Sequence, residues 1–258
     1  MESLQNLEQF ILGLGQVVVG LSGGVDSCLL AFVARKMVGR DNVLAVTGDS
    51  ASVPSRDREF VVKFCEEHDI PHQFMLTYEH NNPNYQSNPS NRCFFCKEEL
   101  YQRLNEIAHA RGWKNVLDGT NVSDLSGHRP GFEALKKAGV IAPYVELGID
   151  KNRVRNIAKH FNLEVADKAQ SACLASRIPT GTPIDLEALQ KVDRAENLLR
   201  DLGILNPRVR FHGDLARLEL KPEEWENCFS KREIIRKELQ TLGFKFVTLD
   251  LKAYEREG

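Results

Sequence analysis

The chain has 258 residues, of which 42% are hydrophobic and 27% are charged, and its formal net charge is −2. This composition is typical of a folded globular protein, and the near-neutral charge argues against a chain-wide surface for nucleic acid. Residues 1–10 lack the basic and apolar regions of a signal peptide, and no apolar run reaches the roughly 18–20 residues of a membrane span, so we expect a cytoplasmic protein. In that reducing compartment, the six cysteines favour metal binding or catalysis over disulfides.

The first half of the chain alternates between strand and helix patterns. Apolar, β-branched runs predict strands at 16–21, 43–47, 72–76 and 115–118, and helical periodicity predicts helices at 26–38, 55–68 and 95–111. This alternation predicts an α/β fold with a parallel sheet and helices on both faces. Ligands of such sheets bind at the carboxyl ends of the strands, where the sequences SGGVDS, TGDSAS and LDGTNVSD fall.

A glycine-rich turn follows the first predicted strand. Gly23 and Gly24 let the backbone approach an anion, which the first N–H groups and the dipole of the next helix attract. The stretch lacks the Gly-Lys-[Ser/Thr] ending of a Walker A loop and the GxGxxG of a dinucleotide fingerprint. SGGVDS instead resembles the PP-loop of the ATP pyrophosphatases, which split ATP into AMP and pyrophosphate while activating a carbonyl or carboxylate. The alternative is an ordinary strand–turn–helix in which Ser27 is the N-cap.

The PP-loop resemblance implies roles for several polar residues. Asp26 would help to hold Mg²⁺–pyrophosphate, and Ser22 and Ser27 would bind phosphate oxygens. We expect Asp49 beside the nucleotide and Asp124 as a second carboxylate for Mg²⁺, although the segment around Asp124 also fits a turn with a helix cap. The predicted ATP-binding set is Gly20, Leu21, Ser22, Gly23, Gly24, Asp26, Ser27, Asp49, Gly119 and Asp124, with Asp26 also catalytic.

Cysteine spacing gives the second chemical signal. Cys93 and Cys96 form a CxxC motif just before a predicted helix. The motif follows a polar segment, 80–92, that reads as a loop able to close over the site, and Cys173 lies in a later polar segment. Three thiolates can hold an iron–sulfur cluster with one open iron. Zinc would need a fourth ligand such as His80 or His212, and a redox pair is the third possibility. The other cysteines, Cys28, Cys65 and Cys228, lie in apolar helical patterns and are predicted to be core residues.

A composition break within 167–184 divides the chain into predicted domains at 1–168 and 169–258. Asp150 is predicted to cap a helix before the break. After it, we expect a smaller α+β domain with a helix near 186–202, two strands in RVRFH and ARLEL, a helix near 223–241 and a last strand in FKFVTLDL.

Three arginines are candidates for binding an anionic substrate. Arg208 and Arg210 share one face of a predicted strand, and their guanidinium groups, with that of Arg177, suit phosphate or carboxylate. The alternative is a solvated strand face. Glu196 and Glu219 are weaker candidates that we expect to form surface salt bridges.

Four segments together resemble the LarE family of PP-loop sulfur transferases: GLSGGVDS, LDGTNVSDLSGHRPG, CLASRIPTG, and RVRFHGDLARLEL with the closing FVTLDL. The resemblance implies adenylation of a carboxylate of a nicotinate-derived pyridinium mononucleotide and its conversion to a thiocarboxylate, for a nickel-pincer nucleotide cofactor. It also implies a PP-loop (adenine nucleotide alpha hydrolase-like) domain, a C-terminal domain for sulfur transfer and oligomerisation, and a homo-oligomer such as a hexamer.

The family resemblance implies two sulfur sources. One version of the family sacrifices a single cysteine, at the position of Cys173. The other holds a 4Fe-4S cluster on three cysteines, and its open iron carries an extra sulfide. Cys93 and Cys96 place this chain with the second version, with Cys93, Cys96 and Cys173 as cluster ligands and Cys173 also catalytic.

Two other functions remain open from the sequence. A tRNA thiolase, or another thiolase of the PP-loop class, would use the same ATP chemistry, but a tRNA enzyme should show an RNA-binding module or a basic surface. A non-catalytic iron–sulfur scaffold would bind ATP without releasing pyrophosphate. The expected partner is therefore a small anionic nucleotide, with neither membrane nor nucleic acid.

Overall fold

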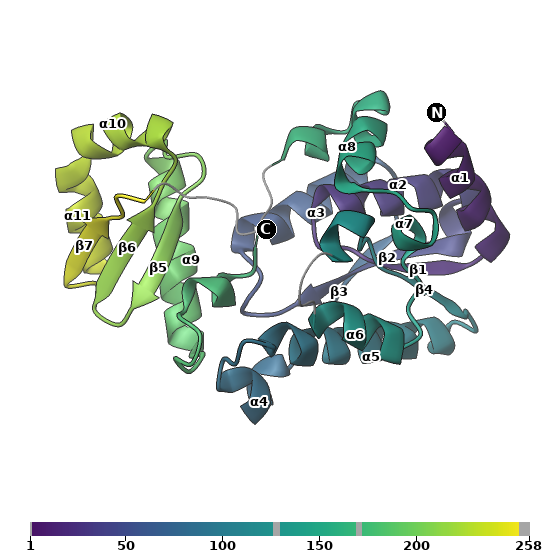
Figure 1. Ribbon diagram of the computed structural model, residues 1–258, viewed down its shortest axis with the longest axis horizontal. Helices are drawn as coiled ribbons and strands as arrows, with labels where there is room; N and C mark the ends of the chain where they lie inside the picture. The colour runs from purple at the N-terminus through teal and green to yellow at the C-terminus, as the bar shows by residue number, and fades with distance from the viewer. Residues whose placement is uncertain (1, 126–129, 169–171, 253–258) are drawn as a thin grey trace. The chain divides into compact units, whose positions relative to one another are not determined.

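The computed structural model describes residues 2–125, 130–168 and 172–252. Parts of two predicted segments, 126–129 and 169–171, lie outside the described residues. The chain forms two compact units (Figure 1). Unit 1 comprises 1–50, 57–85 and 91–171, and unit 2 comprises 51–56, 86–90 and 172–258. Two short segments from the predicted first domain therefore belong to the second unit.

Unit 1 contains a parallel sheet of four strands, in the order β3-β2-β1-β4. The strands are β1 (Val17–Gly20), β2 (Val43–Asp49), β3 (His72–Leu76) and β4 (Asn115–Leu117). Side chains of β1 alternate between two cores, because Val17 and Val19 face one core and Val18 faces the other. A strand that is buried on both faces reads as a continuous apolar run, which is why the sequence predicts β1 correctly.

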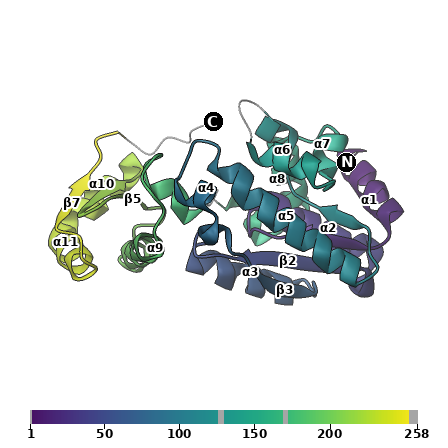
Figure 2. The same cartoon turned by 90° about the horizontal axis from the view of Figure 1, so that it is seen from below.

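Helices cover both faces of this sheet (Figures 1 and 2). One core joins it to α1 (Glu2–Leu14), α2 (Val25–Val38), α3 (Ser55–Glu67) and α8 (Lys151–His160), and the other to α5 (Arg92–Ala110) and α6 (Pro130–Lys137). The predicted α/β fold is therefore confirmed. The remaining short elements of this part of the chain are η1 (Arg40–Asn42), η2 (Glu79–Asn81), α4 (Pro83–Gln86), η3 (Val122–Leu125), α7 (Pro143–Glu146) and η4 (Glu164–Asp167).

Unit 2 is built on a mixed sheet in which β5 (Arg208–His212) pairs antiparallel with β6 (Leu215–Glu219), and β6 pairs parallel with β7 (Phe246–Leu249). Its core contains side chains from this sheet and from three helices, α9 (Leu186–Asp201), α10 (Pro222–Ser230) and α11 (Arg232–Thr241). A short helix, η5 (Leu174–Arg177), follows Cys173.

One predicted helix is wrong in its extent. The structure divides the segment near 223–241 into α10 and α11 at Lys231. The backbone of Lys231 has φ −103° and ψ 10°, and its ammonium donates to the carbonyl oxygen of Leu202. That contact fixes the turn between the two helices. None of the helices among the described residues is both long and apolar enough to cross a membrane.

Candidate functional site

The candidate site lies at the carboxyl end of the unit 1 sheet, between β1 and β4, where the strand order reverses. β2 and β4 pair with opposite edges of β1, so the loops after β1 and β4 diverge at the carboxyl end of the sheet. Such a switch point is where open α/β sheets bind ligands. The PP-loop follows β1, and the segment from Asp118 to Asp124 follows β4.

Hydroxyl groups tie the PP-loop to the first turn of α2. The Ser22 N–H donates to Ser27 Oγ at 3.1 Å, the two hydroxyl oxygens are 3.1 Å apart, and Ser27 Oγ donates to the Gly24 carbonyl at 3.2 Å. Gly24, not Ser27, is the N-cap of α2, and the described residues provide no side-chain cap there. A helix that begins on an uncapped glycine can offer its first N–H groups to a phosphate.

Two glycines allow close packing around this loop. Gly23 has φ +77°, a conformation that favours glycine. A Cβ on Gly119 would lie 2.8 Å from the Ser27 nitrogen and 3.0 Å from the Asp26 carbonyl carbon. The close approach that Gly119 permits is therefore to the backbone of α2.

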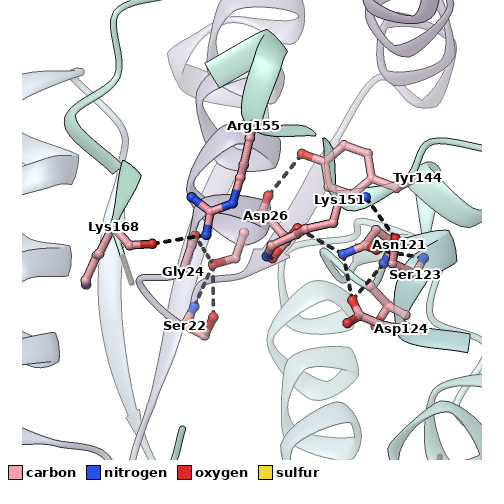
Figure 3. Close-up of polar contacts among 12 residues, drawn as sticks. Ser22, Gly24, Asp26, Asn121, Ser123, Asp124, Tyr144, Lys151, Arg155 and Lys168 are labelled. Carbon is pink, nitrogen blue, oxygen red and sulfur yellow. Dashed lines mark hydrogen bonds and ion pairs between the residues drawn. The ribbon is translucent and has the colours of Figure 1, made fainter. Parts of the chain in front are cut away.

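Asp26 is the centre of a network of polar side chains (Figure 3). Its Oδ2 pairs with the ammonium of Lys151, and its Oδ1 accepts from Asn121 Nδ2 at 3.0 Å. The same amide donates to Asp124 Oδ2 at 2.7 Å, so it bridges the two carboxylates. The Tyr144 hydroxyl donates to the Asp26 carbonyl oxygen at 3.0 Å. The predicted pair of acids is thus brought together, through an asparagine that the sequence analysis did not single out.

Burial and charge act in opposite directions on Asp26. Burial raises the pKa of the Asp26 carboxyl above its ordinary value, and the nearby charge of Asp124 adds to this rise, although the Lys151 ammonium offsets part of it. Carboxylate oxygens are the ligands that Mg²⁺ prefers, so the donor set of Asp26 and Asp124 fits this ion.

A second lysine lies against the PP-loop. Lys168 donates to the Gly23 carbonyl at 3.0 Å and to Asp57 Oδ1 at 3.1 Å, and its ammonium lies 3.6 Å from the centre of the Phe60 ring. Arg155 donates to the carbonyl oxygens of Ala166 and Lys168, which fixes the backbone that carries this lysine. Lys168 therefore brings positive charge to the loop that the sequence predicts to bind pyrophosphate.

Asp49, predicted beside the nucleotide, ends β2. Its carboxylate pairs with Arg58 at 3.1 Å, and the same guanidinium donates to the Ser50 carbonyl. Its side chain is one-third exposed. Asp49 is thus anchored at the carboxyl end of the sheet, where the sequence predicts it.

A buried cluster at the end of β4 joins Asp118 to the CxxC helix. Asp118 Oδ2 accepts from Lys97 Nζ at 3.0 Å and from the Tyr101 hydroxyl at 2.9 Å, and Oδ1 accepts from Thr120. Burial would raise the pKa of Asp118, but Lys97 and these hydrogen bonds outweigh burial and hold it below its ordinary value. The cluster fixes Lys97, which follows Cys96 directly in the chain.

The six cysteines divide into two groups. Cys28, Cys65 and Cys228 are buried, as expected for core residues, and burial raises the pKa of each thiol, that of Cys65 to about 12. Cys93 is exposed and Cys96 half-buried in the first turns of α5, in unit 1, and Cys173 is exposed, in unit 2. Within neither unit do the described residues gather three His, Cys, Asp or Glu side chains that could hold a metal ion. The cluster therefore stays a prediction.

Arg177 has an internal role. Its side chain is 1% exposed and pairs with Glu196 through Nε at 2.8 Å and Nη2 at 3.1 Å. Its Nη1 donates to the carbonyl oxygens of Ala172 and Cys173, at 2.7 and 3.1 Å. A guanidinium engaged at every nitrogen has little to offer a substrate, so the geometry argues against the predicted role of Arg177. It holds the Cys173 segment instead.

Glu196 was expected on the surface, and this expectation is wrong. It is fully buried, and it accepts hydrogen bonds from Arg177, Arg200 and the Val209 N–H. Buried carboxylates are stable only with such partners.

The remaining predicted substrate arginines lie on β5. Arg210 is half-buried, and its guanidinium donates to Glu219 Oε2 at 2.8 Å and to the Ser176 carbonyl at 2.5 Å. Arg208 is buried and stands opposite Glu219 in the β5–β6 register. Glu219 also accepts from Arg217, so this face of the sheet carries paired charges.

Comparison of the sequence with known proteins shows the family of this chain. The NAD synthase family model matches residues 6–120. An uncharacterized protein of Synechocystis, slr1717, is 42% identical over 98% of this chain and 94% of its own. Pyridinium-3,5-bisthiocarboxylic acid mononucleotide synthase of Lactiplantibacillus plantarum is 34% identical over 93% of this chain and 87% of its own.

More distant similarity extends to the tRNA 2-thiolation protein NcsA of Haloferax volcanii, 25% identical over 65% of this chain and half of that protein. The Lactiplantibacillus relative, by contrast, matches both units. With its identity and coverage, and with the PP-loop geometry of unit 1, the chain belongs to the LarE family of PP-loop sulfur transferases, which are enzymes that use ATP.

Proposed function

We propose that this enzyme adenylates a carboxylate of a pyridinium mononucleotide and converts it to a thiocarboxylate, as a step toward a nickel-pincer nucleotide. The observation that carries the proposal is the 34% identity to the Lactiplantibacillus synthase across both units. The PP-loop network around Asp26 supports it, because this network has the carboxylates and helix N-terminus that Mg²⁺–pyrophosphate needs.

In the first step, a carboxylate oxygen of the substrate attacks the α-phosphorus of ATP. The bond to the bridging oxygen breaks, and pyrophosphate leaves with the electron pair. The N–H groups of the α2 first turn and the hydroxyls of Ser22 and Ser27 bind its oxygens, and Lys168 adds positive charge beside the loop. Mg²⁺ held by Asp26 and Asp124 would neutralise the phosphate charge. The protein contributes mainly position and electrostatic stabilisation.

In the second step, a sulfide attacks the acyl carbon of the adenylate, and AMP leaves to give the thiocarboxylate. A 4Fe-4S cluster held by Cys93, Cys96 and Cys173 would supply this sulfide at its open iron. Cys93 and Cys173 are both exposed. Arg177 and Glu196 hold the backbone of Cys173 in place.

Arg208 and Arg210 are proposed to bind the anionic groups of the substrate. Arg210 would do so by exchanging Glu219 for phosphate or carboxylate, to which a guanidinium fork binds well. We further propose a cytoplasmic homo-oligomer such as a hexamer. Sedimentation of the purified protein tests its assembly, and a monomer at all concentrations would refute it.

The experiment is to count iron and acid-labile sulfide after anaerobic purification, together with ATP-dependent pyrophosphate release on pyridinium-3,5-biscarboxylate mononucleotide. We expect about four of each per chain, loss of both in Cys93→Ser, and a product in which sulfur replaces oxygen. Cys228→Ser is the matched control, because Cys228 is buried in the core of unit 2.

Other outcomes select other functions. Iron-free protein that still makes thiocarboxylate, and loses Cys173 as a thiol in doing so, would return Cys173 to the role of sacrificial sulfur donor. Binding of bulk tRNA at physiological salt would favour a tRNA thiolase. ATP binding without pyrophosphate release on any substrate would leave a nucleotide-binding scaffold.

A further inference from the structure

Lys168 makes three contacts beside the PP-loop. Its ammonium donates to the Gly23 carbonyl oxygen at 3.0 Å and to Asp57 Oδ1 at 3.1 Å. It also lies over the Phe60 ring, 3.6 Å from the ring centre. An ammonium has three N–H donors, so these contacts occupy each of them. Lys168 could therefore reach a phosphate only by giving up one of these contacts.

The backbone of Lys168 is held as well. Its N–H donates to the Val165 carbonyl oxygen at 3.1 Å, and its own carbonyl oxygen accepts from Arg155 Nη2 at 3.2 Å (Figure 3). The side chain is 23% exposed, and that of its partner Asp57 is 12% exposed. Both ends of the Lys168 side chain are thus fixed, which suits a residue that holds another group in place.

The contact with Gly23 fixes the direction of one peptide group in the PP-loop. The Gly23 carbonyl and the Gly24 N–H belong to the same trans peptide, so they point in opposite directions. Because Lys168 holds the carbonyl, the Gly24 N–H points away from Lys168. A peptide between two glycines turns over with little steric resistance, since neither residue has a Cβ. Its direction therefore depends on the hydrogen bonds that it makes.

The Gly24 N–H is available to a ligand. Gly24 is the N-cap of α2, and no atom of residues 2–125, 130–168 and 172–252 accepts a hydrogen bond from its N–H. N–H groups of a glycine-rich turn and of a helix start bind an anion when they converge on it. If this peptide turned over, its carbonyl oxygen would face the anion and repel it.

We propose that Lys168 is a positioning residue that sets the anion-binding conformation of the PP-loop. By holding the Gly23 carbonyl, Lys168 keeps the Gly24 N–H directed at the departing pyrophosphate, and it does not itself bind the phosphate oxygens. Asp57 and Phe60 in turn hold the ammonium. This inference rests on the proposed function only in taking the PP-loop as the pyrophosphate site.

Two variants separate position from charge. Lys168→Met removes both the hydrogen bond to Gly23 and a positive charge. Lys168→Met combined with Asp57→Asn removes the same hydrogen bond but one charge of each sign, and it leaves no buried carboxylate unpaired. If Lys168 acts through its charge alone, the double variant should bind Mg²⁺–pyrophosphate like the wild type. If it sets the peptide, both variants should bind about tenfold more weakly, because one N–H contact to a charged ligand is lost.

One amide signal reports on the peptide directly. Gly24 is the only glycine in the chain that follows another glycine. The complete protein, labelled with ¹³C at glycine carbonyls and ¹⁵N at glycine nitrogens, therefore gives a single signal in an HNCO spectrum. In the wild type, Mg²⁺–pyrophosphate should move the Gly24 amide proton downfield as it forms a hydrogen bond. In both variants, this shift should be absent at saturating pyrophosphate.

Lys63→Met is the matched control. Lys63 lies on α3, as Asp57 and Phe60 do, but it is 69% exposed and pairs with Glu164. Both the pyrophosphate affinity and the Gly24 signal should stay as in the wild type. A full downfield shift in saturated Lys168→Met would overturn the positioning role, and so would wild-type affinity in the double variant.

Failure of the proposed function is recognised separately. A protein whose Gly24 signal responds to pyrophosphate only with Lys168 present, but which never forms thiocarboxylate, would retain the role of Lys168 and lose the proposed reaction. A protein that forms thiocarboxylate, and whose Lys168→Met variant gives the wild-type Gly24 shift, would retain the reaction and lose this role.

Discussion

Gly119→Ala should disturb the site through packing alone. The new methyl would lie 2.8 Å from the Ser27 nitrogen and 3.1 Å from the Ser27 Cα, whereas ordinary contacts of a Cβ are 3.4–4 Å. These neighbours are backbone atoms, so no side chain can rotate to relieve the contact. The strand end and the first turn of α2 must separate by roughly 0.6 Å, which is the gap between 2.8 Å and the ordinary contact.

The expected cost follows from this separation. Overpacking of this kind costs about 1–3 kcal/mol, which lowers the midpoint of thermal unfolding by roughly 2–12 °C in a unit of this size. Because the displaced turn carries Asp26 and Ser27, the rate of pyrophosphate release should fall by about tenfold or more, since a misplacement of ~1 Å can cost ~100-fold.

The assay compares Gly119→Ala with Gly13→Ala, by calorimetry, ATP binding and pyrophosphate release. Gly13 lies within α1 and has no atom within 4 Å of its would-be Cβ, so alanine there should stabilise the protein by about 0.5–1 kcal/mol and leave activity unchanged. Wild-type stability and ATP affinity in Gly119→Ala would refute the steric reasoning.

Two further predictions concern buried charges. Glu196→Ala leaves Arg177 buried without its partner and should cost about 3–5 kcal/mol in urea unfolding, whereas Glu233→Ala, at a surface pair with Arg236, should cost less than about 1 kcal/mol; equal costs would contradict the structural role of Glu196. Because Lys97 holds the pKa of Asp118 below its unfolded value of about 3.9, this carboxylate stabilises the wild type above that pH, and the contribution is lost as pH falls through the lowered pKa. In Lys97→Met, burial should instead raise the pKa of Asp118 above ~3.9. The contribution of Asp118 to stability then reverses sign, and the variant loses stability as pH rises from ~3.9 toward the raised pKa. Parallel pH–stability curves for wild type and Lys97→Met would rule out this linkage.

The sheet of unit 1 was predictable because its signal is local. Residues Val17, Val18 and Val19 are all fully buried, so each contributes to one apolar run that the sequence displays directly. Asp26 and Asp124 could be predicted to meet because both follow strands of one parallel sheet. Lys151 could not, because it is 125 residues from Asp26 and no pattern in the sequence connects α8 to the loop.

Glu196 shows a signal that the sequence does contain. It lies four residues after Val192 and three before Leu199, which places it on the apolar face of α9. A charged residue on such a face must be buried with a partner. The expectation that a charged side chain lies on the surface is therefore wrong at this position. Arg177, 19 residues earlier, could be recognised as that partner only from the fold.

Unit 2 is discontinuous along the chain, and this affects how the protein is made. Its pieces include the segments 51–56 and 86–90, which reach the rest of the unit through Ser55 to Asn197 and Asn88 to Thr182, separations of 142 and 94 residues. During synthesis these early segments must wait until the last third of the chain has left the ribosome. Contacts between residues so far apart in the chain form slowly. The nascent protein therefore passes through a stage in which the unit 1 sheet has formed but segments 51–56 and 86–90 have not yet packed against the rest of unit 2. A fragment that starts at residue 172 would lack these contacts, so the second unit cannot be separated from the first by one cut.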